Sequence, residues 1–185
     1  MQNKYCDLLE REDAQIFSAF NNDQGWFKQL IFNKKGSIID ASAIDRNNRK
    51  CHVEIKQRTG KYGSFKEFID NFETIYLDYG KMNEFSEIML HSGATRNEGE
   101  AFVSIFDKGD TILVHDICKP QPTLHMPNQR VWNEARRQWD IEHKVGLYWW
   151  CATIYKKQED GHYRKLNDDE VDQLKWNTKL VQHTN

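Results

Sequence analysis

The amino-acid sequence predicts one α/β domain with a C-terminal elaboration, and three observations lead to this fold class. The chain has 185 residues, a length that suits a single domain with a sizeable core. Apolar residues recur at helical spacing in some segments and alternate as in strands in others. The expected elements of residues 6–117 follow one another as helix, strand, hairpin, helix, strand and strand, and residues 118–185 form the elaboration.

The first part of the chain begins with a helix expected over residues 6–21. Apolar side chains recur there at helical spacing, and Asp7 can cap the start of the helix. The apolar and aromatic segment 26–32 predicts a first strand. Residues 37–58 predict a hairpin, whose polar turn lies near residues 46–49.

A second helix is expected over residues 65–85, because apolar and aromatic side chains form one stripe: Phe65, Phe68, Ile69, Phe72, Ile75 and Tyr76. Residues 101–106 and 110–117 are rich in valine, isoleucine and phenylalanine, which suit buried strands. A short glycine-containing turn lies between these two segments and predicts a hairpin.

The C-terminal elaboration begins with residues 119–128, which hold all three prolines and are expected to be irregular. We then expect a short basic helix over 128–142, an aromatic strand over 145–155 and a last helix over 168–181, capped by Asn167. About sixty residues are few for an independent core, so the elaboration is assigned to the same domain.

Composition and charge restrict the classes of partner. The net charge is −2, so any binding to a polyanion depends on local cations such as Lys56, Arg58, Lys61 and Lys66. The four cysteines lack the spacing of a metal site and indicate thiols in a reducing cytoplasm. No apolar run approaches the ~18 residues of a membrane span, and the polar N-terminus does not resemble a signal peptide.

The residues best suited to chemistry lie on the expected hairpin. Its second strand carries Glu54, Ile55 and Lys56, and strand alternation places the carboxylate and the ammonium on one face. On the first strand Asp40 alternates with apolar neighbours, so the hairpin can bring it beside Glu54 and Lys56. Two acids and a lysine on one patch of a sheet can hold a divalent metal and order a water near a phosphate.

The acid that accompanies Glu54 depends on the register of the hairpin. A three-residue turn centred on Asn48 places Asp40 opposite Lys56, on the face of both motif residues. A two-residue turn moves Asp40 to the other face. Asp45 is the alternative acid, but it lies close to the turn in either register and is expected to help form it.

An acid on one strand, followed by hydrophobic-Glu-x-Lys on the next, resembles the PD-(D/E)xK nuclease superfamily, which has the restriction-endonuclease-like fold. The resemblance extends over residues 6–117, although no proline precedes Asp40. It implies a mixed central sheet flanked by helices, with the metal site on the central hairpin. It also implies that Asp40, Glu54 and the Ile55 carbonyl bind Mg²⁺ or Mn²⁺, while Lys56 positions the water that attacks a DNA phosphodiester.

Four further residues are candidates for the same site. In the superfamily a further acid often comes from the first helix, where Glu10 and Glu12 are available. Arg58 returns to the face of Glu54 and can contact the DNA backbone without reading bases. Lys81, on the expected second helix, either lines the same cleft or is an ordinary surface lysine.

A second Glu-x-Lys pair, Glu142 and Lys144, follows a segment expected to be helical and lacks an acid-bearing strand before it. The alternative function is a nucleic-acid-binding or assembly module that keeps the fold without catalysis. The tryptophans of the C-terminal region favour a protein interface, unless they are ordinary core. The sequence does not decide between a monomer and a homodimer, although nucleases that cut both strands often pair.

Overall fold

The computed structural model describes residues 4–33, 39–78, 98–117, 121–133 and 137–183. The helices in these ranges are α1 (Lys4–Gln24), α2 (Phe65–Asn71) and α4 (Asp168–His183). The strands are β1 (Phe27–Phe32), β2 (Ala41–Asp45), β3 (Lys50–Gln57), β4 (Thr74–Asp78), β5 (Glu98–Phe106), β6 (Thr111–Asp116), β7 (Thr123–Asn133), β8 (Gln138–Tyr148), β9 (Thr153–Lys157) and β10 (Tyr163–Lys165). Short 3₁₀ turns cover Gly60–Tyr62, Asp107–Gly109 and Trp149–Cys151.

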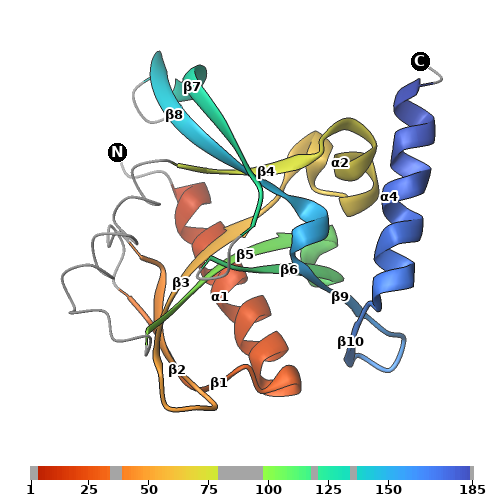
Figure 1. Ribbon diagram of the computed structural model, residues 1–185. Helices are drawn as coiled ribbons and strands as arrows, with labels where there is room; N and C mark the ends of the chain where they lie inside the picture. Colours follow the sequence, from red (N-terminus) through yellow and green to blue (C-terminus); the bar gives the residue numbers. More distant parts are fainter. Residues whose placement is uncertain (1–3, 34–38, 79–97, 118–120, 134–136, 184–185) are drawn as a thin grey trace.

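Seven strands form the central sheet, in the order β1-β2-β3-β5-β6-β9-β10. β3 runs parallel to β5, whereas the other neighbouring strands are antiparallel, so the sheet is mixed. Figure 1 shows β3 and β5 side by side in the middle of the molecule. A parallel pair needs a long crossover, and the one between these strands contains α2 and β4. The predicted α/β fold class is therefore confirmed.

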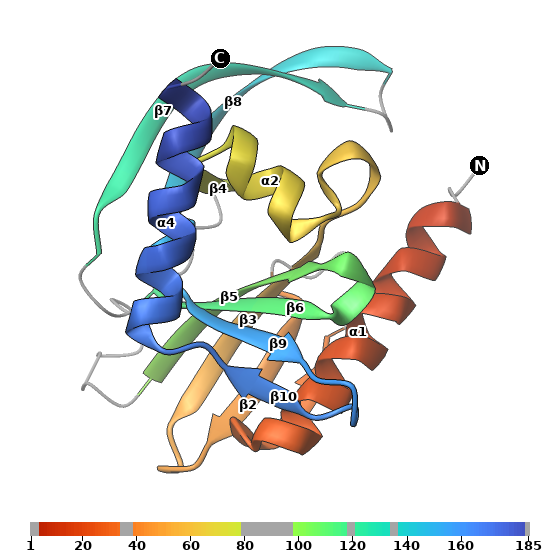
Figure 2. The same ribbon diagram turned by 90° about the vertical axis from the view of Figure 1, so that its right-hand side faces the viewer.

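Helices cover both faces of the central sheet (Figure 2). On one face α1 packs Phe17 and Phe20 against Ile55 of β3 in an apolar core. On the other face α2 contributes Phe65 to a second core, which contains Phe102 of β5. The helical spacing that predicted α1 is confirmed by the burial of Phe17 and Phe20. None of the helices in the described ranges combines the length and the apolar character needed to cross a membrane.

The helix expected over residues 65–85 is shorter in the structure, because α2 ends before Phe72. Phe72 already has extended backbone angles (φ −137°, ψ 138°), and β4 follows. Ile75 is fully buried whereas Tyr76 is 36% exposed, which is the alternation of a strand. β4 pairs with β8, which is distant in the sequence, so sheet pairing overrode the helical spacing. Residues 79–85 lie outside the described part of the chain.

The basic helix expected over residues 128–142 is instead a hairpin of β7 and β8. With β4 these strands form a separate three-stranded sheet, in the order β4-β8-β7, and the hairpin projects beyond the central sheet in Figure 1. β7 is an edge strand, where proline is tolerated at a bulge. Pro127 falls where the register shifts, and Asn128 has a φ of 58°. Much of the segment expected to be irregular is therefore extended.

The aromatic strand expected over residues 145–155 is divided between the two sheets. β8 ends in the three-stranded sheet, a 3₁₀ turn follows, and β9 pairs with β6 of the central sheet. Trp149 in this turn is 1% exposed, and its ring lies edge-on to Phe65 with centroids 5.9 Å apart. The turn therefore joins the two sheets around a buried tryptophan.

The last helix begins with a reciprocal pair of capping hydrogen bonds. Asn167 Oδ1 accepts a hydrogen bond from Glu170 N (2.9 Å), and Glu170 Oε2 accepts one from Asn167 N (2.9 Å). Two donors of the first helical turn are satisfied in this way. The expected capping role of Asn167 is therefore confirmed.

The turn between β9 and β10 is held to the end of α1 by Asp23. One carboxylate oxygen of Asp23 accepts a hydrogen bond from Tyr163 N (2.7 Å), and the other lies 2.5 Å from His162 Nδ1. The hydrogen bond with His162 is the largest cause that lowers the pKa of Asp23 to about 2. The same bond raises the pKa of His162 above its ordinary value of 6.5.

We expect the His162–Asp23 pair to stabilise the fold in weak acid and to lose this effect in alkali. The contribution is fully present below the ordinary pKa of histidine and is lost as the pH rises through the raised pKa. His162→Gln should therefore lower the melting temperature at about pH 5.5 and change it much less at about pH 9. In an Asp23→Asn background the same substitution should have an equal effect at both pH values. An equal loss at both pH values in the wild-type background would contradict the prediction.

Candidate functional site

The central hairpin of β2 and β3 has a different register from the one expected. Ala41 pairs with Val53, and this pair lies at the start of β2. The register predicted for the hairpin, with Asp40 opposite Lys56, is wrong by two residues. Asp40 lies just outside the paired strands, so strand alternation does not assign it to a face of the sheet.

The shift arises in the turn, which is centred on Asn47 rather than on Asn48. Asn48 has a positive φ of 61°, and its N–H donates to the Asp45 carbonyl oxygen (3.1 Å). Three-residue hairpin loops commonly end on a residue in this left-handed conformation, which asparagine tolerates. Asn48 is therefore the last residue of the loop, and the strands pair accordingly.

Asp45 belongs to the turn and lies away from Glu54. Its Oδ1 accepts hydrogen bonds from the N–H groups of Asn47 and Arg49 (both 2.8 Å), and its Oδ2 accepts one from Arg49 Nε (2.7 Å). Burial acts to raise the pKa of Asp45, but these hydrogen bonds outweigh it and lower the pKa. Strand alternation places Asp45 on the α1 face of the sheet, together with Ala43. The expected turn-forming role of Asp45 is confirmed.

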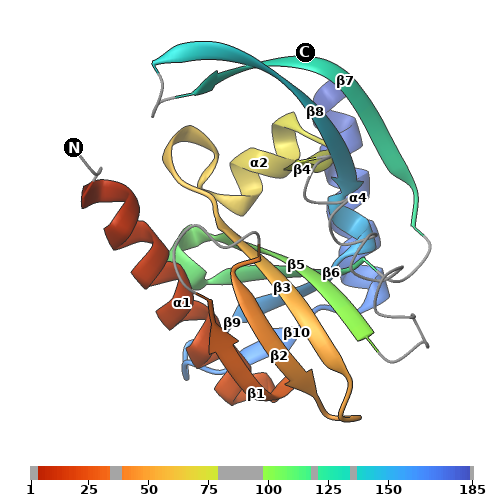
Figure 3. The ribbon, with the colours of Figure 1, turned by 90° about the vertical axis from the view of Figure 1, so that its left-hand side faces the viewer.

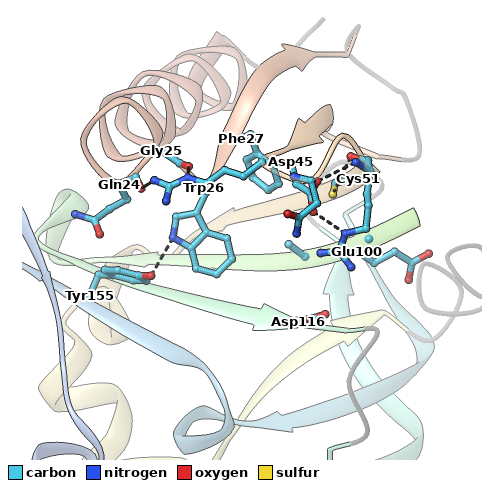
Figure 4. A pocket seen from close by; sticks show the side chains of 14 residues that line it. Gln24, Gly25, Trp26, Phe27, Asp45, Cys51, Glu100, Asp116 and Tyr155 are labelled. Atoms are coloured by element: carbon cyan, nitrogen blue, oxygen red, sulfur yellow. Dashed lines mark hydrogen bonds and ion pairs between the residues drawn. The ribbon is translucent and has the colours of Figure 1, made fainter. Parts of the chain in front are cut away.

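A pocket of about 480 Å³ lies beside this turn, at the end of α1 (Figure 4). Several of its polar groups bind one another: Arg46 donates to the backbone carbonyls of Gln24 and Gly25, and Trp26 Nε1 donates to the Tyr155 hydroxyl (2.9 Å). The described residues that line it do not include the Glu-Ile-Lys motif of β3. The pocket is therefore separate from the candidate site.

Asp40 is tied to the backbone of β3 at the point where the hairpin opens. The pairing of β2 with β3 ends at Ala41 and Val53, and Asp40 Oδ2 accepts a hydrogen bond from Ile55 N (2.7 Å). The carboxylate thus takes the place of a strand partner. The N–H and C=O of one strand residue point to the same side, so the Ile55 carbonyl is directed toward the side of Asp40.

Glu54 and Lys56 share one face of β3 but differ in their exposure to solvent. Glu54 is 2% exposed, and β3 is flanked by β2 and by β5, where Phe102 is the register partner of Glu54. Lys56 is exposed. The arrangement places a buried carboxylate and a solvent-exposed ammonium two residues apart on one strand.

The first helix brings a carboxylate to this site at Asp13, which the sequence analysis did not include. Asp13 is half-buried and accepts a hydrogen bond from the Gln57 backbone. Burial is the largest cause that raises the pKa of Asp13 to about 6, and the charge of Asp40 raises it further. Lys56 acts in the opposite direction. Asp13, Asp40 and Lys56 therefore lie close enough for their charges to interact.

A signal for Asp13 was present in the helix. Residues 13, 17 and 20 lie on one face of an α-helix, and Phe17 and Phe20 of this face are buried. An acid on an otherwise apolar stripe must be satisfied by the protein, whereas an acid on the solvent face need not be. Glu12 is exposed, and the side chain of Glu10 lies outside the described part of the structure.

Arg58 lies on the same face as Glu54 and Lys56, as expected from strand alternation. Its side chain is half-buried, with Nη2 3.5 Å from Ser104 Oγ and the guanidinium carbon 5.9 Å from the centre of the Phe102 ring. Burial lowers the pKa of Arg58 to about 10. Lys81 lies outside the described residues.

The oxygen atoms at the hairpin suit a hard divalent ion such as Mg²⁺. Within the described ranges, no three His, Cys, Asp or Glu side chains are grouped to hold a metal ion. Mg²⁺ is often bound by one or two carboxylates and keeps several waters. Asp40, Glu54 and the Ile55 carbonyl offer such a set of hard oxygen atoms, and the hydrogen bond from Ile55 N to Asp40 fixes one carboxylate beside this carbonyl.

The second Glu-x-Lys pair lies on a strand rather than after a helix. Glu142 and Lys144 are both on β8 and form an ion pair with each other. Glu142 is opposite Gln129 of β7. The residue opposite Glu142 on the neighbouring strand is therefore not an acid.

No protein-family model matches the chain, and no curated protein matches it either. The candidate site is defined by its own geometry: the buried carboxylate of Glu54, the carboxylate of Asp40 bound to the Ile55 N–H, and the exposed ammonium of Lys56. The signal that located it was the Glu-x-Lys spacing on a strand preceded by an acid-bearing strand.

Proposed function

We propose that this protein is a nuclease of the PD-(D/E)xK type that hydrolyses phosphodiester bonds of DNA with Mg²⁺ or Mn²⁺. The observation that carries the proposal is the position of Asp40, whose carboxylate binds the Ile55 N–H, next to Glu54 in the chain, where β2 and β3 separate. The order of helices and strands, and the parallel pairing of β3 with β5, support the restriction-endonuclease-like fold as part of the same proposal.

The residues of the hairpin have different roles in the proposed hydrolysis. Asp40, Glu54 and the Ile55 carbonyl would hold the ion, which when bound polarises the phosphate and lowers the pKa of a bound water. The Lys56 ammonium positions the attacking water and offsets the negative charge that develops in the transition state. Asp13, close to the charges of Asp40 and Lys56, supplies the helix-borne acid.

Local cations near the end of β3 contact the DNA backbone in this proposal, because the net charge of the chain is −2. Arg58 is the main candidate. Lys66, on α2, forms an ion pair with Asp70, with 2.6 Å between Nζ and Oδ2, so its charge is partly offset. Cys151 is an exposed thiol, which suits the reducing cytoplasm that we propose as the compartment.

The test combines cleavage with metal binding. We expect the purified chain to cut DNA with Mg²⁺ or Mn²⁺ and to leave it intact in EDTA. Asp40→Asn should abolish both cleavage and saturable Mn²⁺ binding in a calorimetric titration, because it removes one of two carboxylates. If the wild-type chain neither cuts DNA nor binds Mn²⁺, the nuclease proposal is wrong.

A protein-assembly role is the second candidate, and the β7–β8 hairpin favours it. Ile141 is 71% exposed, and Trp139 and Leu124 are 55% and 42% exposed. Large apolar side chains on a projecting hairpin suit contact with another protein or a second copy of this chain. An assembly module needs no metal, so the Mn²⁺ titration separates the two candidates.

A further inference from the structure

A pocket of about 330 Å³ lies next to Lys56, between the end of β3 and the segment formed by α2 and β4. Figure 3 shows the chain leaving β3, passing through a loop and entering α2, and the loop contains the 3₁₀ turn Gly60–Tyr62. The pocket volume is at the lower end of the roughly 300–1,000 Å³ range of small-molecule sites. It has room for one small planar group with its attached anion.

Aromatic rings form one wall of this pocket. Tyr62 and Phe72 pack edge to face with centroids 4.7 Å apart, and Phe68 lies behind Phe72 at 5.4 Å. Tyr76 of β4 also lines the pocket and is 36% exposed. Its register partner on β8 is Gly146, which has no side chain to cover the ring. The wall therefore combines an accessible ring, Tyr76, with a group of three aromatic rings packed on one another.

A cation forms the other part of the lining. Arg58 lines the pocket, and its Nε is buried without a hydrogen-bond partner among the described residues. Arg58 Nη2 lies 3.5 Å from Ser104 Oγ, the guanidinium carbon lies 5.9 Å from the centre of the Phe102 ring, and no described carboxylate forms an ion pair with Arg58. A half-buried guanidinium without a carboxylate favours an anion, and its planar fork suits phosphate in particular.

We propose that this pocket binds one unpaired nucleotide next to the phosphodiester that is cut, with its phosphate on Arg58 and its base against Tyr76. The inference rests on the proposed nuclease function and names its substrate class: single-stranded nucleic acid, or the frayed end of a duplex. A paired base is stacked inside the double helix and enters such a pocket only after unpairing and unstacking, which costs a few kcal/mol by the usual estimate for base flipping.

Binding to short fluorescent oligothymidylate in EDTA, measured by anisotropy, tests the pocket without cleavage. Base–aromatic stacking makes the wild-type chain bind oligothymidylate about 5- to 100-fold more tightly than an abasic strand of the same length. Tyr76→Ala should remove this difference, whereas Tyr76→Phe should keep it. Arg58→Ala should weaken binding of both strands. Trp176→Ala, at a 68% exposed position on α4, is the matched control and should change neither.

Cleavage with Mn²⁺ separates failure of the pocket from failure of the nuclease proposal. We expect a single strand to be cut at least about 10-fold faster than its blunt duplex, given the cost of unpairing. Suppose that both substrates are cut at equal rates and that the wild-type chain binds thymidylate and abasic strands equally. The proposed nucleotide pocket would then be contradicted, and the nuclease proposal would stand. Base-dependent binding through Tyr76 without any cleavage would support the proposed nucleotide pocket and contradict the nuclease proposal. The comparison of strands on the wild-type chain decides the question even if Tyr76→Ala does not fold.

Discussion

Lys56→Ala should reduce the rate of DNA cleavage at least about 100-fold while leaving the fold intact. Lys56 is exposed at the end of the central strand β3, on the face of Glu54, so its ammonium is the cation best placed to act on a water near the two carboxylates. Removing an exposed side chain usually changes stability by less than about 0.5 kcal/mol. The expected loss is therefore in turnover and not in the amount of folded protein.

The measurement is the single-turnover cleavage rate of a labelled strand with saturating Mn²⁺, alongside a urea denaturation curve. Lys165→Ala is the matched control, because Lys165 is exposed on β10, the edge strand at the far end of the sheet from β1. It should cut DNA at the wild-type rate. Unchanged cleavage by Lys56→Ala would remove the lysine from the mechanism and, with it, the main argument for a Glu-x-Lys site.

Parts of the fold that depend on neighbouring residues could be predicted from the sequence. The apolar stripe of α1 identified Phe17 and Phe20 as core, and both are buried. Asn167 was identified as the cap of α4 from its side-chain chemistry. The hairpin of β2 and β3 was predicted from strand alternation, and the alternation also placed Glu54 and Lys56 on one face. In each case the sequence signal that predicted the feature lies within a few neighbouring residues.

Segments whose structure depends on distant partners could not be predicted in this way. Residues 74–78 carry apolar side chains compatible with a helix, but their backbone hydrogen bonds go to β8, about seventy residues later. Residues 128–142 were also expected to be helical, although their partners are near: β7 and β8 form a hairpin, and each strand satisfies the backbone groups of the other. Pro127 signalled irregularity, yet an edge strand with a bulge accommodates it.

The candidate site was predicted as a set of residues more accurately than as a geometry. Asp40 was predicted to lie opposite Lys56, but the register of β2 with β3 depends on Asn48 taking a left-handed conformation at the end of the loop. An error of one residue in the centre of a turn becomes two residues in the register. Asp13 was not identified, because only the packing of α1 on the sheet brings it to the charges of Asp40 and Lys56.

Trp149→Ala should destabilise the protein by about 3–5 kcal/mol, the usual cost of removing a buried aromatic side chain. Trp149 is 1% exposed and packs edge-on to Phe65, with Trp150 5.3 Å from it on another side. It lies where the chain passes from β8 of the small sheet to β9 of the central sheet. The cavity would therefore open at the joint between the two sheets, beneath α2.

Urea denaturation followed by tryptophan fluorescence and by far-UV circular dichroism measures this loss. Trp176→Ala is the control, because Trp176 is 68% exposed on α4 and its removal should cost less than about 0.5 kcal/mol. A loss below about 1 kcal/mol for Trp149→Ala would mean that the joint is not closely packed. The α2–β4 wall would then not be held rigidly against the central sheet, and the aromatic pocket beside Lys56 would lose the preorganisation on which stacking of a base depends.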